Sequence, residues 1–301
     1  MSAVAVSSLA VGALPAPGWS FEPATIAIAL LACAAYAHRA GRLSKRGRRV
    51  PIWKQGAFYL GVAVLLGSLI SPLDALAETR LFYAHMVQHL LIGEVAPLLI
   101  VLGLNGPLLR PLLTIPAIAR LRPLLNPLVA LPLWAFNLYV WHLPVLYEAA
   151  LRNDAVHVFE HGCFFWAGIF MWGALIEPLP GPSWFSSGAK MAYVVVVRAL
   201  GCGILGNTLI WIGAPLYPYY GEAERLAGIA PLTDQQTGGA IMFVWGAFVT
   251  ITLFSWFFLR WAREAEQRQS LLDSGTSPRV AARAARYGRR RVDRAPQPPS
   301  P

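Results

Sequence analysis

The chain has 301 residues, of which 56% are hydrophobic and 13% are charged, whereas soluble domains carry about 25% charged residues. This composition excludes an ordinary soluble domain. The net charge of +10 would suit a nucleic-acid-binding protein, but the basic residues lie in loops and in the C-terminal tail, which indicates a membrane protein and argues against a nucleic-acid partner.

Seven apolar stretches approach the roughly 20 residues that a helix needs to cross a bilayer. In chain order they are 22–38, 53–70, 81–103, 124–143, 155–177, 189–213 and 237–260. Clusters of Pro and Gly, such as EPLPGP at 177–182, separate them. The sequence therefore predicts an all-α, polytopic membrane bundle with seven transmembrane helices.

Three segments follow from this pattern. Residues 22–262 form the seven-helix transmembrane domain, and residues 1–21 form an extracytoplasmic lead-in that lacks the basic start of a cleaved signal peptide. Residues 263–301 are rich in Arg, Ala and Pro. We expect this basic tail to be disordered, cytoplasmic and in contact with anionic lipid.

The distribution of Lys and Arg predicts the orientation of the bundle. With seven spans, 21 of the 25 basic residues fall on one side, and only Arg80, Arg152 and Arg225 fall in the opposite loops. Loops rich in Lys and Arg are cytoplasmic by the positive-inside rule. We therefore expect the N-terminus outside and the C-terminus in the cytoplasm.

Five of the six histidines fall at the outer end of the predicted helices. They are His85 and His89 in the third helix, His142 at the end of the fourth, and His157 and His161 in the fifth. The sixth, His38, ends the first helix on the opposite side. The orientation was derived from Lys and Arg alone, so the gathering of histidines at one face is independent of it.

The spacing of these histidines predicts a metal or haem site. Residues four apart share one face of a helix, so His85/His89 and His157/His161 can each present two imidazoles to a common point. Imidazole suits Zn, Cu, Fe and Ni, which leaves the metal open. A single interfacial histidine is often a hydrogen-bonding filler, but two such pairs together with His142 favour a ligand set.

Further residues could complete the site. Gln88 and Glu160 precede the second histidine of each pair and could orient an imidazole, and Met86 could add a thioether ligand for Cu(I). Asp234 and Gln235 precede the seventh helix, where they either cap that helix or contact the histidine layer.

Two charged residues lie near mid-membrane in the predicted topology. Glu94 is in the third helix and Arg198 in the sixth, at similar depth, and we expect them to form an intramembrane ion pair. The three cysteines, Cys33, Cys163 and Cys202, lie in apolar stretches without CxxC spacing and are expected to be small core residues.

Two short patterns have little weight. GCGILG at 201–206 spells GxGxxG, but it lies inside an apolar stretch with no strand before it, which favours helix packing over dinucleotide binding. HVFEH at 157–161 spells the HxxEH zinc motif of a protease family, but nothing else in the sequence supplies a substrate cleft.

Three segments resemble the caa3-type cytochrome c oxidase assembly factor family, the CtaG-like seven-helix membrane proteins. They are HMVQHLLIGEVAPLLIVLG at 85–103, WHLPVLYEAAL at 141–151 with the HxxEH helix after it, and DQQTGGAIMFVWG at 234–246. The resemblance runs from about residue 25 to 262. It implies a role in maturing a haem-copper oxidase by delivering copper, with the five outer histidines as metal ligands and Asp234 and Gln235 as motif members.

The sequence and the resemblance together predict a multi-pass protein of the bacterial cytoplasmic membrane that is not an enzyme. It would bind copper at the outer face and deliver it to an oxidase subunit. The main alternative is a b-type haem protein in electron transfer, and zinc is a further possible occupant. A membrane metalloenzyme is less favoured, because Glu160 is the only carboxylate in the histidine layer.

Overall fold

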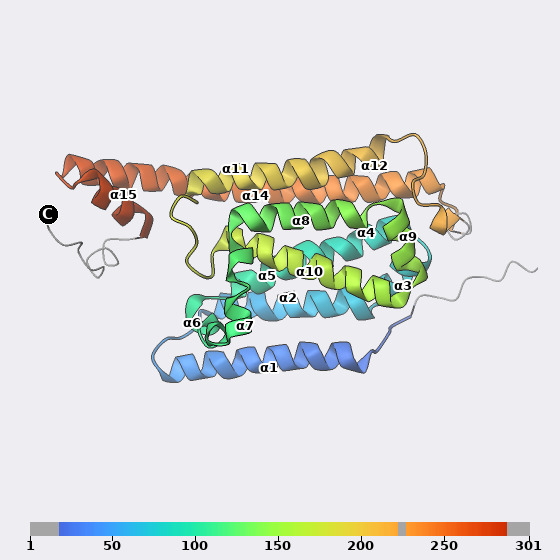
Figure 1. The fold of residues 1–301 in the computed structure, drawn as a ribbon, viewed down its shortest axis with the longest axis horizontal. Coiled ribbons are helices and arrows are strands. Elements are labelled where there is room, and N and C mark those ends of the chain that lie inside the picture. Colours follow the sequence, from blue (N-terminus) through green and yellow to red (C-terminus); the bar gives the residue numbers. More distant parts are fainter. Residues whose placement is uncertain (1–17, 222–226, 288–301) are drawn as a thin grey trace, which may run out of the picture.

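The computed structural model describes residues 18–221 and 227–287, and every regular element in these ranges is a helix. The long continuous helices are α1 (Pro23–Lys45), α2 (Ile52–Ile70), α10 (Asp154–Ile176) and α14 (Pro231–Asp273). Figure 1 shows them running side by side along one direction. The all-helical prediction is confirmed for this part of the chain.

Two further long helices are interrupted by π-helical segments. The first consists of α4 (Phe82–Leu90), η1 (Leu91–Val95) and α5 (Ala96–Gly103), and the second of α11 (Ser187–Arg198), η4 (Ala199–Gly206) and α12 (Asn207–Trp211). Pro97 follows η1 and has no backbone N–H to bond the preceding turn, which favours the wider helix there. Such single-turn π segments often lie at functional sites.

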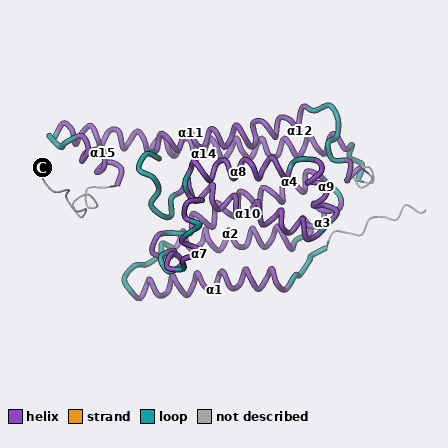
Figure 2. The backbone as a smooth tube through the Cα atoms, in the orientation of Figure 1, coloured by secondary structure: helices purple, strands orange, loops and turns teal. Residues whose placement is uncertain are grey.

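Short helices join these long ones. They are α3 (Pro72–Thr79), α6 (Gly106–Leu109), η2 (Leu112–Thr114), α7 (Pro116–Ala119), η3 (Arg122–Leu125), α9 (Pro144–Arg152), η5 (Pro218–Tyr220) and α15 (Pro278–Tyr287). The backbone trace in Figure 2 shows that they lie at the two ends of the bundle. Their positions leave the middle of the molecule to the long helices.

Within residues 18–221 and 227–287, six helices are long and apolar enough to cross a membrane, and a seventh is added if a bent pair counts as one span. That pair joins residues 116–125 to α8 (Pro127–Trp141) with a bend of 84°. Pro127 begins α8, and Asn126 caps it by accepting a hydrogen bond from the Leu128 amide, so the chain turns sharply at this point. The predicted fourth span is thus the 15-residue α8.

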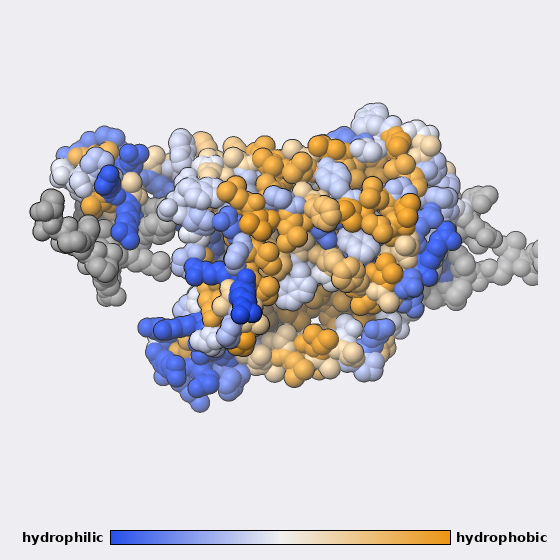
Figure 3. Space-filling model, in the orientation of Figure 1, coloured by the Kyte–Doolittle hydropathy of each residue, from blue (hydrophilic) through white to orange (hydrophobic). Residues whose placement is uncertain are grey.

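The surface supports a membrane setting. Figure 3 shows apolar side chains over the middle of the bundle and hydrophilic ones gathered at both ends. Large apolar side chains such as Ile28, Leu31, Phe136 and Phe248 are more than 60% exposed along the helices. Water would disfavour such a band, whereas lipid tails accommodate it.

A close approach of two helices holds the centre of the bundle. A Cβ atom added at Gly168 of α10 would overlap the carbonyl oxygen of Gly93 in η1. Gly61 of α2 and Gly103 of α5 allow a similarly close contact between those two helices. Small residues at such crossings let helix backbones pack closely in lipid. α10 is thereby fixed against the helix that begins as α4.

The C-terminal region differs from the prediction of a disordered tail from residue 263. α14 continues to Asp273, and α15 folds back against it with Ala281 and Ala284 buried. Residues after 262 include many strong helix formers, and Glu264 bonds both Arg260 and Ser187, which extends the helix beyond the apolar stretch. The rest of the predicted tail, 288–301, and most of the predicted lead-in, 1–17, lie outside the described residues.

The contact between Gly168 and Gly93 predicts a large effect of one methyl group. Gly168→Ala should lower the stability of the purified protein by about 1–3 kcal/mol, because the two backbones must move apart. Gly162→Ala is the matched control, since a Cβ at Gly162 of the same helix meets nothing within 4 Å. Thermal unfolding in detergent measures both, and equal melting temperatures for the two variants would contradict this packing.

A candidate metal centre

The helix that carries the first histidine pair is anchored by a carboxylate from the far end of the chain. Asp234 of α14 accepts hydrogen bonds from the backbone amides of Phe82 (2.7 Å) and Tyr83 (2.9 Å) at the start of α4. These amides have no partner inside their own helix, and a negative charge suits the positive end of the helix dipole. Asp234 thus caps α4 and fixes where His85 and His89 lie.

Gln88 secures the other face of α4. Its Nε2 donates to the carbonyl oxygen of Ser68 (3.0 Å) and to Oδ1 of Asp74 (2.6 Å), which ties α4 to α2 and α3. Burial, with the negative charge of Glu78 nearby, raises the pKa of Asp74 to about 6.

The second histidine pair lies on α10, which begins at the same end of the bundle. The side chain of Asn153 caps this helix by accepting hydrogen bonds from the amides of Ala155 (3.0 Å) and Val156 (3.2 Å). The first two turns of α10 then present His157, Glu160 and His161 toward α4.

The four imidazoles of α4 and α10 form two pairs, each with one ring from either helix. The ring centroids of His85 and His157 are 5.5 Å apart, and those of His89 and His161 are 5.4 Å apart. Along each helix the successive rings are 4.1 Å apart. The i,i+4 spacing in the sequence therefore brings both pairs together, as predicted.

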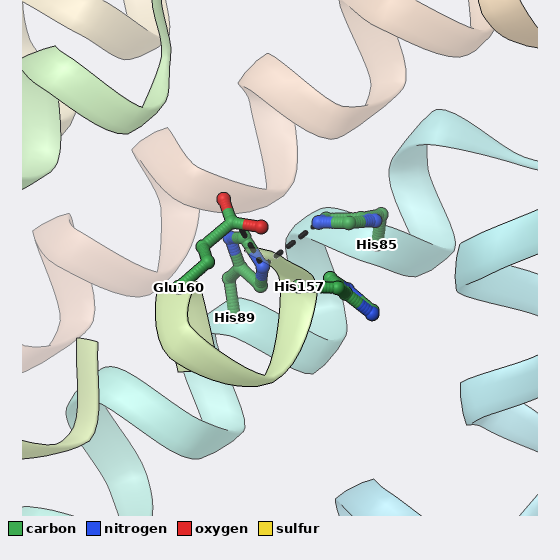
Figure 4. A group of neighbouring side chains, drawn as sticks. All are labelled: His85, His89, His157 and Glu160. Atoms are coloured by element: carbon green, nitrogen blue, oxygen red, sulfur yellow. Dashed lines mark hydrogen bonds and ion pairs between the residues drawn. The ribbon is translucent and has the colours of Figure 1, made fainter. Parts of the chain in front are cut away.

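Three of these imidazoles and one carboxylate come closest. Single ligand atoms of His85, His89, His157 and Glu160 all lie within 4.8 Å of one another, and all four residues are buried. Figure 4 shows the rings of His85 and His89 and the carboxylate of Glu160 pointing toward one another. The Nε2 atoms of His85 and His89 are 2.8 Å apart, and Nε2 of His89 is 3.9 Å from Oε1 of Glu160.

This spacing is compatible with one shared ion. A tetrahedral ion with bonds of about 2.0–2.1 Å to nitrogen holds its ligand atoms roughly 3.3 Å apart. The observed separations, 2.8 Å and 3.9 Å, lie on both sides of that value.

Neighbouring acceptors leave the correct nitrogens available. Nδ1 of His157 lies 2.9 Å from Oε1 of Glu78, so that Nδ1–H can donate to this carboxylate while Nε2 keeps its lone pair. Nδ1 of His85 is 3.3 Å from the Ala77 carbonyl oxygen and 3.1 Å from the Tyr220 hydroxyl. In His157 the nitrogen that faces the cluster has no hydrogen-bond partner among the described residues, whereas Nε2 of His85 contacts Nε2 of His89 at 2.8 Å, a contact that a bound ion would replace.

His142 and His161 border the cluster without belonging to the closest four residues. Nδ1 of His142 donates to the carbonyl oxygen of Leu138 (2.7 Å), which leaves Nε2 as an acceptor. The His142 ring is 6.1 Å from that of Phe164, which in turn is 4.5 Å from the ring of His89. The two histidines extend the donor set inward from the four-residue cluster.

Unpartnered buried atoms indicate that the cluster fits a cation. Such atoms are costly to bury without a partner. Those in this layer with no hydrogen-bond partner among the described residues are Nδ1 of His89, Nε2 of His142, His157 and His161, and both carboxylate oxygens of Glu160. All of them can act as metal ligands, and an ion would satisfy several at once.

Four other predicted site residues lie outside the four-residue cluster and hold the surrounding helices and segments in place. Met86 is 1% exposed and packs near Gly238 of α14, outside the four-residue cluster. Gln235 accepts a hydrogen bond from the Leu216 amide (2.6 Å) and fixes the segment that follows α12. Neither Gln88 nor Asp234 has a hydrogen bond to a histidine among the described contacts, so both act by positioning α4.

The predicted ion pair between Glu94 and Arg198 is not among the salt bridges of the described residues. Arg198 is turned toward α14, where its guanidinium carbon is 4.2 Å from the centroid of the Phe243 ring. It also fills the space left by the missing side chain of Gly246. Glu94 and Arg198 instead line one cavity.

Two residues that contact the histidines were not predicted from the sequence. Glu78 ends α3 and faces His157, while Tyr220 in η5 lies against His85 and also donates to the Ala77 carbonyl oxygen (2.7 Å). Glu78 precedes His85 by seven residues. Its location at the same end of the bundle could have identified it as a possible contact of the histidines. Nothing in the local pattern identifies Tyr220, which is 135 residues away from His85.

These features define a helical membrane protein with a buried cluster of histidines and one glutamate at one end of its bundle. The family model for the cytochrome c oxidase caa3 assembly factor matches residues 34–264. The chain belongs to this family, which supports a role in oxidase assembly. The suspected family resemblance is thereby confirmed.

Two curated relatives are similar at lower identity. One is the uncharacterized protein Mb0105 of Mycobacterium bovis and the other the uncharacterized protein MT0111 of Mycobacterium tuberculosis, each 22% identical over 265 residues. The matches cover 82% of this chain but 40% of each relative, so the chain spans less than half of their length. No solved structure matches this chain.

The cap formed by Asp234 generates a prediction. Asp234→Ala should lower stability by about 2 kcal/mol or more, because the buried amide of Phe82 and the partly buried amide of Tyr83 lose a charged acceptor. Thr237→Ala is the control on the same helix, since its hydroxyl is exposed and bonds only its own helix at Thr233. Unfolding followed by tryptophan fluorescence measures the difference, and a melting temperature of Asp234→Ala equal to that of Thr237→Ala would contradict the anchoring role.

Proposed function

We propose that this protein binds copper at the cluster of His85, His89, His157 and Glu160 and delivers it to a subunit of a haem-copper oxidase. The observation that carries the proposal is the convergence of these four buried ligand atoms within 4.8 Å. Membership of the oxidase assembly factor family supplies the client. Binding and handover require no bond-breaking step, so the proposed role is that of a metal chaperone and not of an enzyme.

The charge distribution supports an outward-facing site. Basic residues concentrate at the end of the bundle opposite the histidines, as in the loop after α1, and such loops remain in the cytoplasm. In this orientation the N-terminus and the histidine cluster lie on the outer side of a bacterial cytoplasmic membrane. Copper would then be exchanged near the outer surface.

The donor set is compatible with copper. Imidazole nitrogens suit both copper and zinc, so the ligands alone leave the metal open. Glu160 and the carboxylate of Glu78, which is 2.9 Å from Nδ1 of His157, supply negative charge for a cation. Membership of the oxidase assembly factor family is what favours copper.

The arrangement suits exchange of the ion as well as binding. His161, whose ring pairs with those of His89 and His157, and His142, on the far side of the Phe164 ring from His89, both have unpartnered Nε2 atoms. His161 is therefore the nearer replacement ligand when the ion exchanges. The pairing of His157 with Glu78, which is 42% exposed, gives one ligand a direct connection to the surface.

The haem alternative is less compatible with these distances. In this alternative two histidines from different helices bind one haem from opposite sides, with the porphyrin between them. The cross-helix ring pairs are His85/His157 and His89/His161, with centroids 5.5 Å and 5.4 Å apart. The next imidazole along each helix is only 4.1 Å away, which leaves no space for a porphyrin between the pairs. The visible spectrum of the purified protein tests this alternative, because bound haem gives a Soret band.

Copper binding by three variants tests the proposal. The purified wild-type protein, titrated anaerobically with Cu(I) against a chelator, should bind it tightly. His85→Ala/His89→Ala and His157→Ala/His161→Ala should each weaken binding by about 100-fold or more, because each removes ligands of the shared ion. His38→Ala is the control, since this histidine is exposed near the opposite end of the bundle. Unchanged binding in both double variants would exclude this site.

The same variants test the role in cells. Cells that lack the gene should have lower cytochrome c oxidase activity under copper limitation, with partial rescue by added copper. The wild-type gene and His38→Ala should restore the activity, whereas the double variants should not. Full oxidase activity without the gene under copper limitation would contradict the assembly role.

A further inference from the structure

A cavity of about 80 Å³ lies inside the bundle next to the histidine cluster. His89 and His142 form part of its wall, so the space begins where the histidine layer ends. A single water needs about 10–15 Å³ in this measure, and the cavity therefore has room for an ion together with several waters. Neither the metal cluster nor its supporting hydrogen bonds account for this space.

Sulfur atoms are concentrated around the cavity. The chain has five methionines and three cysteines, and four of these eight residues line this one space. They are Met86 of α4, Met171 of α10, Cys202 of η4 and Met242 of α14. The four come from four different segments, so no single helix face accounts for their gathering.

The sulfur residues are spread along the depth of the membrane. With a rise of about 1.5 Å per residue, Met86 lies about 6 Å from the histidine end of its helix, and Cys202 and Met242 lie about 13–16 Å from the same ends of theirs. Met171 lies about 25 Å into α10. The series therefore continues inward from the histidine layer toward the opposite end of the bundle.

Cys202 and Met242 both lie near Gly246 of α14. The Sγ atom of Cys202 occupies the space that a side chain at Gly246 would fill, and Met242 precedes Gly246 by one helical turn on the same face of α14. Both π-helical segments reach this cavity, through Glu94 in η1 and Cys202 in η4.

An unpartnered nitrogen points to a ligand here. His142 is 7% exposed and lines the cavity, and its Nε2 has no hydrogen-bond partner in the described part of the chain. His89 is also buried and lines the cavity, and its Nδ1 likewise has no hydrogen-bond partner among the described residues. Buried imidazole and sulfur together form a donor set typical of Cu(I), because soft thiolate and thioether ligands select this ion.

We propose that this cavity is a second copper station, which binds Cu(I) at Cys202 and Met242 and exchanges it with the histidine cluster through His142. This inference rests on the proposed function, since the histidine cluster is its neighbouring site. Copper remains Cu(I) throughout and only changes ligands, so the step needs no reductant. When the Cu–S bond forms, the Cys202 thiol gives its proton to the Glu94 carboxylate, which lines the same cavity. The positive charge of Arg198, which also lines the cavity, favours the resulting thiolate.

X-ray absorption of the copper-loaded protein tests this second station. The wild-type protein, loaded anaerobically with Cu(I), should bind two equivalents, and sulfur should appear in the copper shell together with nitrogen. Cys202→Ser/Met242→Leu should lose the second equivalent and the sulfur signal while retaining the first. Cys163→Ser/Met191→Leu, which changes the same residue types outside the cavity wall, should behave like the wild type.

The two proposals fail in different ways. One equivalent with nitrogen and oxygen ligands only in the wild type would overturn the second station and leave the histidine site standing. Sulfur retained in full by Cys202→Ser/Met242→Leu would also overturn it. A wild-type protein that binds no Cu(I) contradicts both proposals. His157→Ala/His161→Ala should keep the sulfur signal, and because the wild-type spectrum alone reports sulfur ligation, the test does not depend on the folding of any variant.

Discussion

The close approach of α10 to the helix that begins as α4 depends on one glycine, Gly168. A Cβ at Gly168 would overlap the carbonyl oxygen of Gly93, one turn after His89, whereas a Cβ at Gly93 would make only ordinary contacts with Phe164. At that separation the rings of His89 and His161 are 5.4 Å apart. A larger residue at position 168 would force the two backbones apart and move the imidazoles of α10 away from those of α4. The metal site therefore depends on a packing contact that contains no ligand.

Burial then determines which chemistry the site can support. Three imidazoles and a glutamate lie in a low-dielectric interior, and several of their atoms have no partner among the residues that the structure describes. Leaving such groups unpaired is costly, and a single positive charge would offset both the desolvation and the charge of Glu160. The hydrogen bonds to Glu78 and Ala77 are consistent with this function, because each holds an imidazole in the tautomer that coordinates through Nε2.

Much of the fold and of the histidine layer could be predicted from local periodicity. Apolar stretches and the i,i+4 histidine pairs depend on neighbours in the sequence, and both pairs meet as expected. Long-range contacts could not be predicted in this way. The cap of α4 by Asp234 joins residues 152 positions apart, and Arg198 turns to Phe243 instead of Glu94 because Gly246 opens space on α14. The helical extension after 262 depends on the Glu264 contact with Ser187, which no apolar pattern reveals.

The most direct test of the central claim is a structure of the copper-loaded protein by anomalous diffraction at the copper edge. The account predicts an anomalous peak within bonding distance of Nε2 of His85 and His157 and of the Glu160 carboxylate, between α4 and α10. A copper-loaded structure in which these side chains have no peak between them, with the metal bound elsewhere on the protein, would contradict it.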